Sequence, residues 1–219
     1  MIKVERSQPA PASLALEAQK KDGDYNKPDV IERLWQDFHN KCYICGTAEL
    51  QDGVVEHRLP HKNGKFHDRK FDWDNLFWSC RHCNGVKNRG IYDEGIIDCC
   101  RRDPEDLLEF KLMENNVSVA PVNPSDSESA LTAALIYDVF NRRNTGMRDI
   151  QSADRLRWLL QEMNGFYRNF EKYRKQPGNR HNQRMMQACL VRDSAFAEFK
   201  RAYVRKRLDK FPELGEYLR

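Results

Sequence analysis

The chain has 219 residues, of which 40% are hydrophobic and 32% are charged, so it is long enough and apolar enough to fold around a core. No stretch approaches the roughly 18 uninterrupted apolar residues of a membrane-spanning helix. Charges and prolines in the first 21 residues argue against a secretory signal peptide. We therefore expect a cytoplasmic protein with reduced cysteines and no membrane partner.

The net charge of +4 is unevenly distributed along the chain. Residues 145–219 contain 17 Lys and Arg residues against 9 Asp and Glu residues, a balance of +8 that leaves −4 for residues 1–144. Such a basic region either faces an anionic partner or consists of solvated helix faces, and charge alone does not decide between the two.

Four segments are predicted: an extended N-terminal arm at residues 1–27, a compact module at 28–100, a hairpin region at 101–124 and a helical domain at 125–219. The arm contains "SQPAPAS", which disfavours helix, and the turn-forming "KKDGDYNK". A helix is predicted at residues 28–39, because proline fits its first turn and apolar residues follow at helical spacing.

The second half of the chain begins with a predicted hairpin in "DLLEFKLMENNVSVAPV", with its turn at residues 114–116. Ser125 and Glu128 fit a capping box that opens a helix. A longer helix is predicted at residues 149–176, where "PGN" ends it, and a last one at 193–210, with the aspartate at its start as the cap. The aromatic stripes of these helices are assigned to the core.

Seven cysteines, an odd number, argue against a disulfide framework and favour metal binding or free thiols. Four of them form two Cys-x-x-Cys pairs, "CYIC" and "CRHC": Cys42, Cys45, Cys80 and Cys83. A two-residue gap lets one tight turn present two sulfurs to one ion, and four thiolates complete a closed, structural Zn²⁺ site. Redox use is the lesser alternative, because no thioredoxin-like pattern surrounds either pair. His82, inside the second pair, is expected at the surface.

The 34 residues between the two pairs are more than a connection requires. Residues 54–57 are predicted to form a strand that delivers Glu56 and His57 to a loop. Residues 75–79 are predicted to form a second strand and residues 81–89 a helix. The predicted order is strand, loop, strand and helix, closed at its base by the zinc site.

The segment from residue 42 to residue 89 resembles the HNH endonucleases, the ββα-metal nuclease family, in their zinc-ribbon-supported form. The resemblance is carried by Glu56-His57, by Asn75 in "DNL" and by Asn84 in "CRHCNGVK". Most members have His at the last position, so this chain resembles an H-N-N variant. The resemblance implies an α+β fold, with a small ββα-metal core and a mainly helical C-terminal half. It also implies metal-dependent hydrolysis of phosphodiester bonds in nucleic acid, with DNA favoured and RNA, including transfer RNA, open.

Each of the four residues has a chemical role in such a site. His57 is a suitable general base near neutral pH, because the ordinary pKa of histidine is about 6.5. The resemblance makes Glu56 a metal ligand, and Asn84 supplies an amide oxygen of the type that suits Mg²⁺ or Mn²⁺. Asn75 is expected to hydrogen-bond the backbone of the loop after His57 and so to orient the imidazole.

Three further residues are candidates for contacts with the substrate or the metal. Lys87 follows Asn84 by one helical turn and either contacts a phosphate or is an ordinary solvated lysine. His61 and His67 lie near enough in the sequence to assist the metal or the substrate, although histidines are common in loops.

The whole arrangement, from "MIKVERS" to the helical half, also resembles the PtuB-type HNH subunit of Septu-like and retron-associated anti-phage systems. That resemblance implies a partner, an ABC-type ATPase that restrains the nuclease, with the N-terminal arm and the helical half as candidate docking surfaces. Two alternatives are a zinc-supported nucleic-acid-binding module without catalysis and a subunit whose main task is to bind the ATPase.

Overall fold

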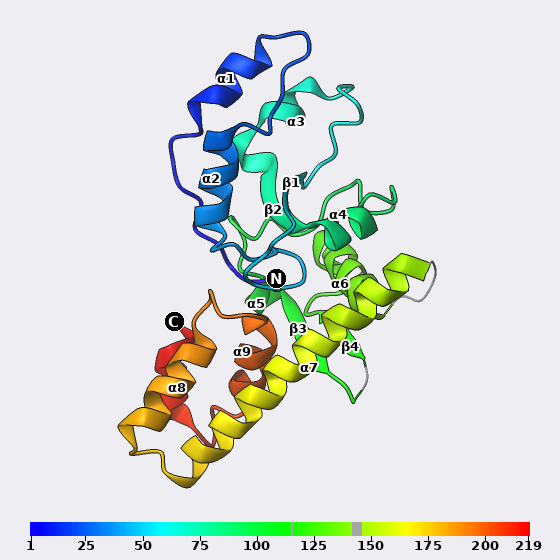
Figure 1. Cartoon of the computed structure of the whole chain (residues 1–219). Helices are drawn as coiled ribbons and strands as arrows, with labels where there is room; N and C mark the ends of the chain where they lie inside the picture. Colours follow the sequence, from blue (N-terminus) through cyan, green and yellow to red (C-terminus); the bar gives the residue numbers. More distant parts are fainter. Residues whose placement is uncertain (115, 142–145) are drawn as a thin grey trace.

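The computed structural model describes residues 1–114, 116–141 and 146–219. Helices predominate and two small antiparallel sheets supply the strands, which confirms the predicted α+β class with a helical C-terminal half (Figure 1). None of the helices in the described ranges combines the length and the apolar character that spanning a membrane requires. In chain order the elements are α1 (Ala12–Ala18), α2 (Pro28–Asp37), β1 (Gly53–His57), α3 (His67–Phe71), the 3-10 turn η1 (Trp73–Asn75), β2 (Leu76–Cys80), α4 (Arg81–Lys87), α5 (Pro104–Leu107), β3 (Leu108–Leu112), β4 (Val117–Pro121), α6 (Ser127–Asn141), α7 (Gly146–Lys175), α8 (Arg180–Leu190), α9 (Ala197–Arg205) and the 3-10 turn η2 (Pro212–Leu218).

A ββα unit forms the centre of the first half. Strands β1 and β2 pair antiparallel, with Gly53 opposite Cys80 and His57 opposite Leu76, and α4 follows β2 without a loop. Helices α2 and α4 pack against both strands, so all five residues of β2 are buried and its sequence is a nearly continuous apolar run. The predicted order of strand, loop, strand and helix is therefore present, with Asn75 in η1, directly before β2 and not within it.

The first 27 residues do not form the extended arm that was predicted. They contain α1, which begins directly after Pro11, so the prolines of "SQPAPAS" precede the helix and do not interrupt it. The residues before α1 lie on the protein body: the Val4 amide donates to the Cys99 carbonyl over 3.0 Å. The buried amino group of Met1 forms an ion pair with Glu198 of α9 over 2.8 Å. The residues before α1 are therefore packed on the protein body.

The second half contains the predicted hairpin, β3 and β4, although Asn115 in its turn lies outside the described residues. Two predicted helix caps are wrong. Asp126, not Ser125, caps α6, because its carboxylate accepts hydrogen bonds from the amide and the hydroxyl of Ser129. Helix α9 begins after Phe196, which has a left-handed φ of 50° and donates its amide to the Gly46 carbonyl over 2.8 Å.

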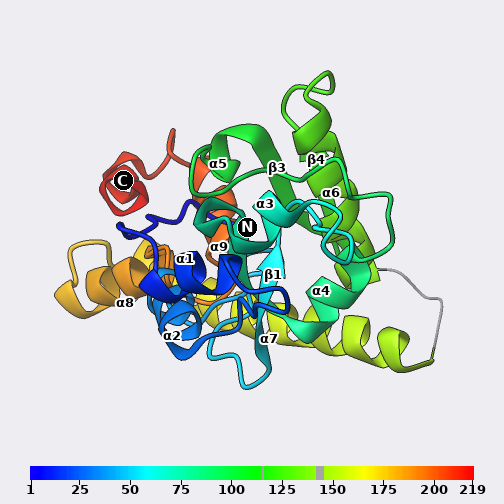
Figure 2. The ribbon, with the colours of Figure 1, turned by 90° about the horizontal axis from the view of Figure 1, so that it is seen from above.

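Helix α8 was not predicted. Its sequence, "RHNQRMMQACL", is polar overall, although its buried residues, Asn182, Met186 and Leu190, recur at helical spacing. Its start is fixed by Asn179, whose side-chain oxygen accepts from the amides of His181 and Asn182. Figure 1 shows α8 packed beside α9 and the C-terminal end of α7, and Figure 2 shows α4 beside α6 and α7, so the two halves pack as one body.

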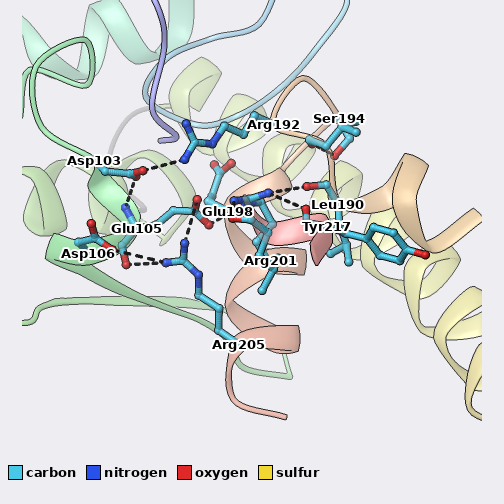
Figure 3. Close-up of polar contacts among 12 residues, drawn as sticks. Asp103, Glu105, Asp106, Leu190, Arg192, Ser194, Glu198, Arg201, Arg205 and Tyr217 are labelled. Atoms are coloured by element: carbon cyan, nitrogen blue, oxygen red, sulfur yellow. Dashed lines mark hydrogen bonds and ion pairs between the residues drawn. The ribbon is translucent and has the colours of Figure 1, made fainter. Parts of the chain in front are cut away.

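Many cations of the basic second half are neutralised within the protein (Figure 3). Their partners are the carboxylates of the short acidic segment before β3. Arg192 lies 2.9 Å from Asp103 and Arg201 lies 2.8 Å from Glu105, while Arg205 approaches the second oxygen of Glu105 at 3.3 Å. Part of the positive charge in this half therefore serves internal ion pairs, whereas other cations, such as Lys172 and Lys175, are exposed.

Candidate active site and metal centre

The four cysteines of the two Cys-x-x-Cys pairs meet in one buried cluster, with their sulfurs within 4.8 Å of one another. The first pair lies in a turn after α2 that is closed by a hydrogen bond from the Gly46 amide to the Cys42 carbonyl; Gly46 adopts a φ of 76°, which suits glycine. The second pair spans the end of β2 and the first turn of α4. Four thiolates bound to one zinc ion at about 2.3 Å lie about 3.8 Å apart, so the cluster has the donors and the spacing to hold such an ion.

Polar groups surround the cluster. The hydroxyl of Thr47 lies 3.2 Å from the Cys45 sulfur, and the Cys83 amide donates to the Cys80 sulfur over 3.5 Å. Arg155, from α7 in the second half of the chain, is buried nearby. Burial lowers the pKa of its guanidinium, but the sulfurs of Cys45 and Cys80 raise that pKa, and the net shift is upward. A cation from the helical half thus balances the negative charge that thiolates bring.

His82 is not at the surface, in contrast to the prediction. Its side chain is only 3% exposed, because the helix that carries it packs against α6 and α7. Its Nε2 donates to the Val139 carbonyl over 3.0 Å, and its Nδ1 lies 3.2 Å from the side-chain oxygen of Gln151. The residue therefore connects the second cysteine pair to the helical half.

A pocket of about 420 Å³ opens beside the ββα unit. It lies between the end of β1, the loop after β1 and the outer face of α4. Its polar and aromatic lining includes residues of the predicted motif and residues from segments outside it: Tyr25, Glu56, His57, His61, Asn84 and Asp93. The structure therefore gathers three of the four motif residues, Glu56, His57 and Asn84, at one pocket.

His57 is held in one orientation. Its Nε2 lies 3.0 Å from the Lys70 carbonyl, and because a carbonyl oxygen only accepts, Nε2 carries the proton. Nδ1 is then the nitrogen that can take up a proton. The Tyr25 ring packs edge-on against the imidazole, with 4.5 Å between the ring centroids. Burial lowers the pKa of His57, so the imidazole is neutral at pH 7 and suited to act as a base.

Asn75 lies behind the pocket and is buried. Its side-chain oxygen accepts from the Leu59 amide over 2.8 Å, and its side-chain nitrogen donates to the carbonyls of Leu59 and Arg69, each over 2.9 Å. These bonds fix the loop that follows His57 and the segment that precedes Lys70. They are the backbone contacts that the sequence led us to expect of Asn75.

Glu56 and Lys87 form a buried ion pair, with 2.7 Å between the carboxylate and the ammonium. Lys87 also donates to the His57 carbonyl over 2.9 Å, and the Tyr43 hydroxyl donates to the other oxygen of Glu56. The Lys87 side chain is 3% exposed, which corrects both the predicted phosphate contact and the solvated alternative. Each Glu56 oxygen keeps a second lone pair, so the carboxylate can still bind a cation, but only next to Lys87.

The remaining candidates differ in position. Asn84 is partly buried, and its side-chain oxygen accepts from Asn88 over 3.2 Å. The ring of His61 lies 4.7 Å from that of His57, so His61 belongs to the pocket. His67 does not border the pocket: it lies in α3, where its ring packs against Phe71.

Two pocket residues were missed from the sequence. Tyr25 lies in "KKDGDYNK", where the only signal was an aromatic residue among turn formers. Asp93 follows α4 and forms an ion pair over 2.8 Å with Lys62, which also lines the pocket. Neither residue has a fixed spacing from the motif, because both reach the pocket only through the tertiary fold.

Comparison with known proteins adds no identification: no protein-family model matches the chain, and no curated protein does. The functional interpretation therefore depends on the pocket and on the cysteine cluster.

Proposed function

We propose that this protein is a metal-dependent endonuclease of the HNH type, which hydrolyses phosphodiester bonds in nucleic acid. The observation that carries the proposal is the setting of His57. Its imidazole is neutral, held through Nε2 by the Lys70 carbonyl, and borders the same pocket as Asn84 and Glu56. A fixed neutral base beside two oxygen donors is what hydrolysis of a phosphodiester requires.

The cysteine cluster is proposed to hold a structural Zn²⁺ through Cys42, Cys45, Cys80 and Cys83. Four buried sulfurs within 4.8 Å, with donors from Thr47 and the backbone, support this assignment. The ion would join the turn after α2 to the start of α4, and so fix the helix that carries Asn84 to the body of the protein.

The divalent ion of the reaction, Mg²⁺ or Mn²⁺, is proposed to bind Glu56 and Asn84. A carboxylate and an amide oxygen are the hard donors that these ions prefer, and both residues border the pocket. When bound, such an ion neutralises charge on the scissile phosphate and on the leaving oxygen. Because Lys87 already balances the charge of Glu56, we expect only modest affinity for the ion.

The protein's own residues carry the proton transfer. His57 Nδ1 takes a proton from the attacking water as the water oxygen bonds to phosphorus, and the opposite ester oxygen leaves with the electron pair of the broken bond. The Lys70 carbonyl then stabilises the imidazolium through the Nε2 proton. Asn75 keeps both His57 and Lys70 in place through its bonds to their neighbours.

The test is cleavage of plasmid DNA and of total RNA by the full-length protein, with Mg²⁺ or Mn²⁺, and with or without a candidate ATPase partner. We expect cleavage by the parent and by His181→Ala, a matched control on α8. We expect no cleavage by His57→Ala, with zinc content unchanged. Undiminished cleavage by His57→Ala would remove the proposed base.

The Glu56–Lys87 ion pair favours a second candidate, a zinc-supported nucleic-acid-binding module without catalysis, because it occupies the carboxylate that a metal would use. This candidate predicts binding that weakens steeply with salt and no products with any metal. The same assay therefore separates the two candidates.

The resemblance to PtuB-type subunits leads us to propose further that the nuclease is the effector of an anti-phage complex with an ABC-type ATPase. Exposed apolar side chains on the outside of α1 and α2, including Leu16 and Trp35, are available for such a partner. Co-purification of the ATPase with the parent, and its loss with Leu16→Glu/Trp35→Glu, is the expected result. Retention of the ATPase by that variant would exclude this surface. The alternative that the protein mainly serves to bind the ATPase would be supported if the complex still forms after both cysteine pairs are removed.

A further inference from the structure

A second hollow, of about 490 Å³, adjoins the pocket that contains His57. The two hollows share His61 and Asn63 in their walls, so they adjoin each other at the loop after β1, and together they are called the groove. The second hollow lies between α3 and the turn that follows α1, two elements that pack against each other at the same end of the molecule (Figure 1). The groove therefore extends from the proposed catalytic pocket to the N-terminal segment.

The far part of the groove is positively charged. Lys20, Lys21 and Lys70 border it, against the single carboxylate of Asp22. Lys21 is exposed and pairs with no carboxylate among the residues that the structure describes. Lys20 contacts Glu17 at 2.7 Å but remains 61% exposed, so its ammonium is still accessible to an anion.

The lysine-bearing turn is firmly built. Glu17, whose side chain is buried, accepts the Asp24 amide over 3.0 Å, and hydrogen bonding from Lys20 lowers the pKa of Glu17 to about 2. Gly23 packs so closely that a Cβ atom there would lie 1.9 Å from the Glu17 carbonyl oxygen. The positions of Lys20 and Lys21 relative to α3 are therefore fixed by the fold.

Lys70 connects this turn to the proposed base. Its ammonium donates to the Gly23 carbonyl over 2.6 Å, and its own carbonyl accepts from Nε2 of His57 over 3.0 Å. One residue thus holds both the wall of the groove and the imidazole, which gives the groove a fixed direction relative to the site of cleavage.

We propose that the phosphodiester backbone of the nucleic acid runs from the pocket through this groove, and that Lys20 and Lys21 bind its phosphates. The inference rests on the proposed nuclease function and assigns a substrate-binding role to the segment after α1. The groove is favoured over the basic second half because its lysines line a hollow that adjoins the pocket with His57, whereas Arg192 and Arg201 of that half pair with Asp103 and Glu105. The shared chemistry is the phosphodiester, which DNA and RNA both supply.

The test is binding of fluorescein-labelled duplex DNA, single-stranded DNA and RNA of one sequence, measured by anisotropy between 50 and 300 mM KCl without divalent metal. We expect Lys20→Gln/Lys21→Gln to weaken binding at 100 mM KCl by about 8-fold if one phosphate contact is lost and about 60-fold if two are lost. The slope of log K against log salt should fall by about 1 to 2. The nucleic acid that shows this loss identifies the substrate type.

The matched control is Lys172→Gln/Lys175→Gln, which removes the same charge from exposed positions at the far end of α7 (Figure 1). It should leave affinity within about twofold of the parent. Equal losses in the two double variants, or no loss in Lys20→Gln/Lys21→Gln, would overturn the groove assignment while the parent still binds and cuts. A parent that neither binds nor cuts any of the three nucleic acids overturns the proposed function and, with it, this inference.

Discussion

Two buried ion pairs, one in the ββα unit and one in the helical half, have the same chemistry in different surroundings. Lys87 lies 2.7 Å from Glu56, and Arg201 lies 2.8 Å from Glu105; no side chain of the four is more than 3% exposed. Removing either cation would leave a buried carboxylate without its nearest charge partner, although Arg205 would remain 3.3 Å from Glu105. By burial and distance alone, the two pairs would be assigned the same role.

Their neighbours differ. Arg201 also donates to the carbonyls of Leu190, Tyr217 and Leu218, so it joins α8, α9 and the C-terminal turn to the segment before β3 (Figure 3). The Lys87 pair instead borders the pocket of about 420 Å³ that contains His57, whereas the hollow beside Glu105 is about 120 Å³ and contains no histidine. The comparison teaches that burial and a cavity do not by themselves make an ion pair a candidate site, and that the imidazole beside Glu56 makes the difference.

The largest expected effect comes from removing the proposed zinc ion, which would support the ββα unit with the Glu56–Lys87 pair but not the helical half with the Glu105–Arg201 pair. Cys80→Ser removes one ligand from the proposed zinc site, and structural zinc contributes an apparent 10–16 kcal/mol or so in small zinc domains. We expect loss of bound zinc, a lower melting temperature and faster hydrogen exchange at residues 42–89 before α9 is affected. Cys189→Ser, outside the cluster, is the control and should retain zinc. Full zinc content in Cys80→Ser would contradict the assignment.

The second prediction breaks the structural pair. Arg201→Met leaves Glu105 buried without its main partner, so we expect the free energy of unfolding to fall by about 3–5 kcal/mol. Denaturant titration measures it. Cleavage per folded molecule should stay unchanged, because Arg201 lies outside the pocket; a loss of cleavage by the folded protein would show that the two pairs are coupled.

A third variant removes the cation of the Glu56–Lys87 pair and can be compared directly with Arg201→Met. Lys87→Met should destabilise the metal-free protein on a similar scale, about 3–5 kcal/mol, because Glu56 loses its charge partner. Mn²⁺ should then raise the melting temperature of this variant more than that of the parent, since the ion can compensate the carboxylate. Arg201→Met is the control, and equal shifts with Mn²⁺ in the two variants would mean that Glu56 is no metal ligand.

The smallest expected effect concerns the carboxylate of Glu17, whose partner Lys20 is exposed. Its folded-state pKa of about 2 lies below its ordinary value of 4.5, chiefly because of the hydrogen bond from Lys20. Its contribution to stability is therefore complete above about pH 4.5 and is lost as the pH falls towards 2. Glu17→Gln should flatten the acid limb of a plot of melting temperature against pH. An unchanged acid limb would show that the Lys20 contact adds nothing measurable.

Local sequence signals predicted the ββα unit well, for physical reasons. Three local signals each act within a few residues. Proline at position 28 fixes the start of α2, glycine at position 46 permits the turn after it, and the run "LFWSC" forms the buried strand β2. The contacts of Asn75 could also be predicted from the sequence. Asn75 directly precedes β2, which pairs with β1, so it lies next to the loop that follows His57.

Contacts between distant segments could not be predicted. The burial of His82 depends on packing against α6 and α7. The Glu56–Lys87 pair depends on contact between β1 and α4, which brings together two residues 31 positions apart in the sequence. The N-terminal segment was assigned as an arm because its prolines act locally, whereas its anchor, Glu198, lies near the other end of the chain. Helix α8 was missed because its sequence is polar overall, although its buried residues, Asn182, Met186 and Leu190, do recur at helical spacing.

The most direct test of the central claim, that His57 is the base, is the rate of cleavage by His57→Ala with and without added imidazole. A general base contributes about 10²- to 10⁴-fold, so the variant should lose that factor. The vacated space borders the pocket, and imidazole should restore part of the rate in proportion to its neutral form. A variant that cuts at the parent rate, with or without imidazole, would contradict the account.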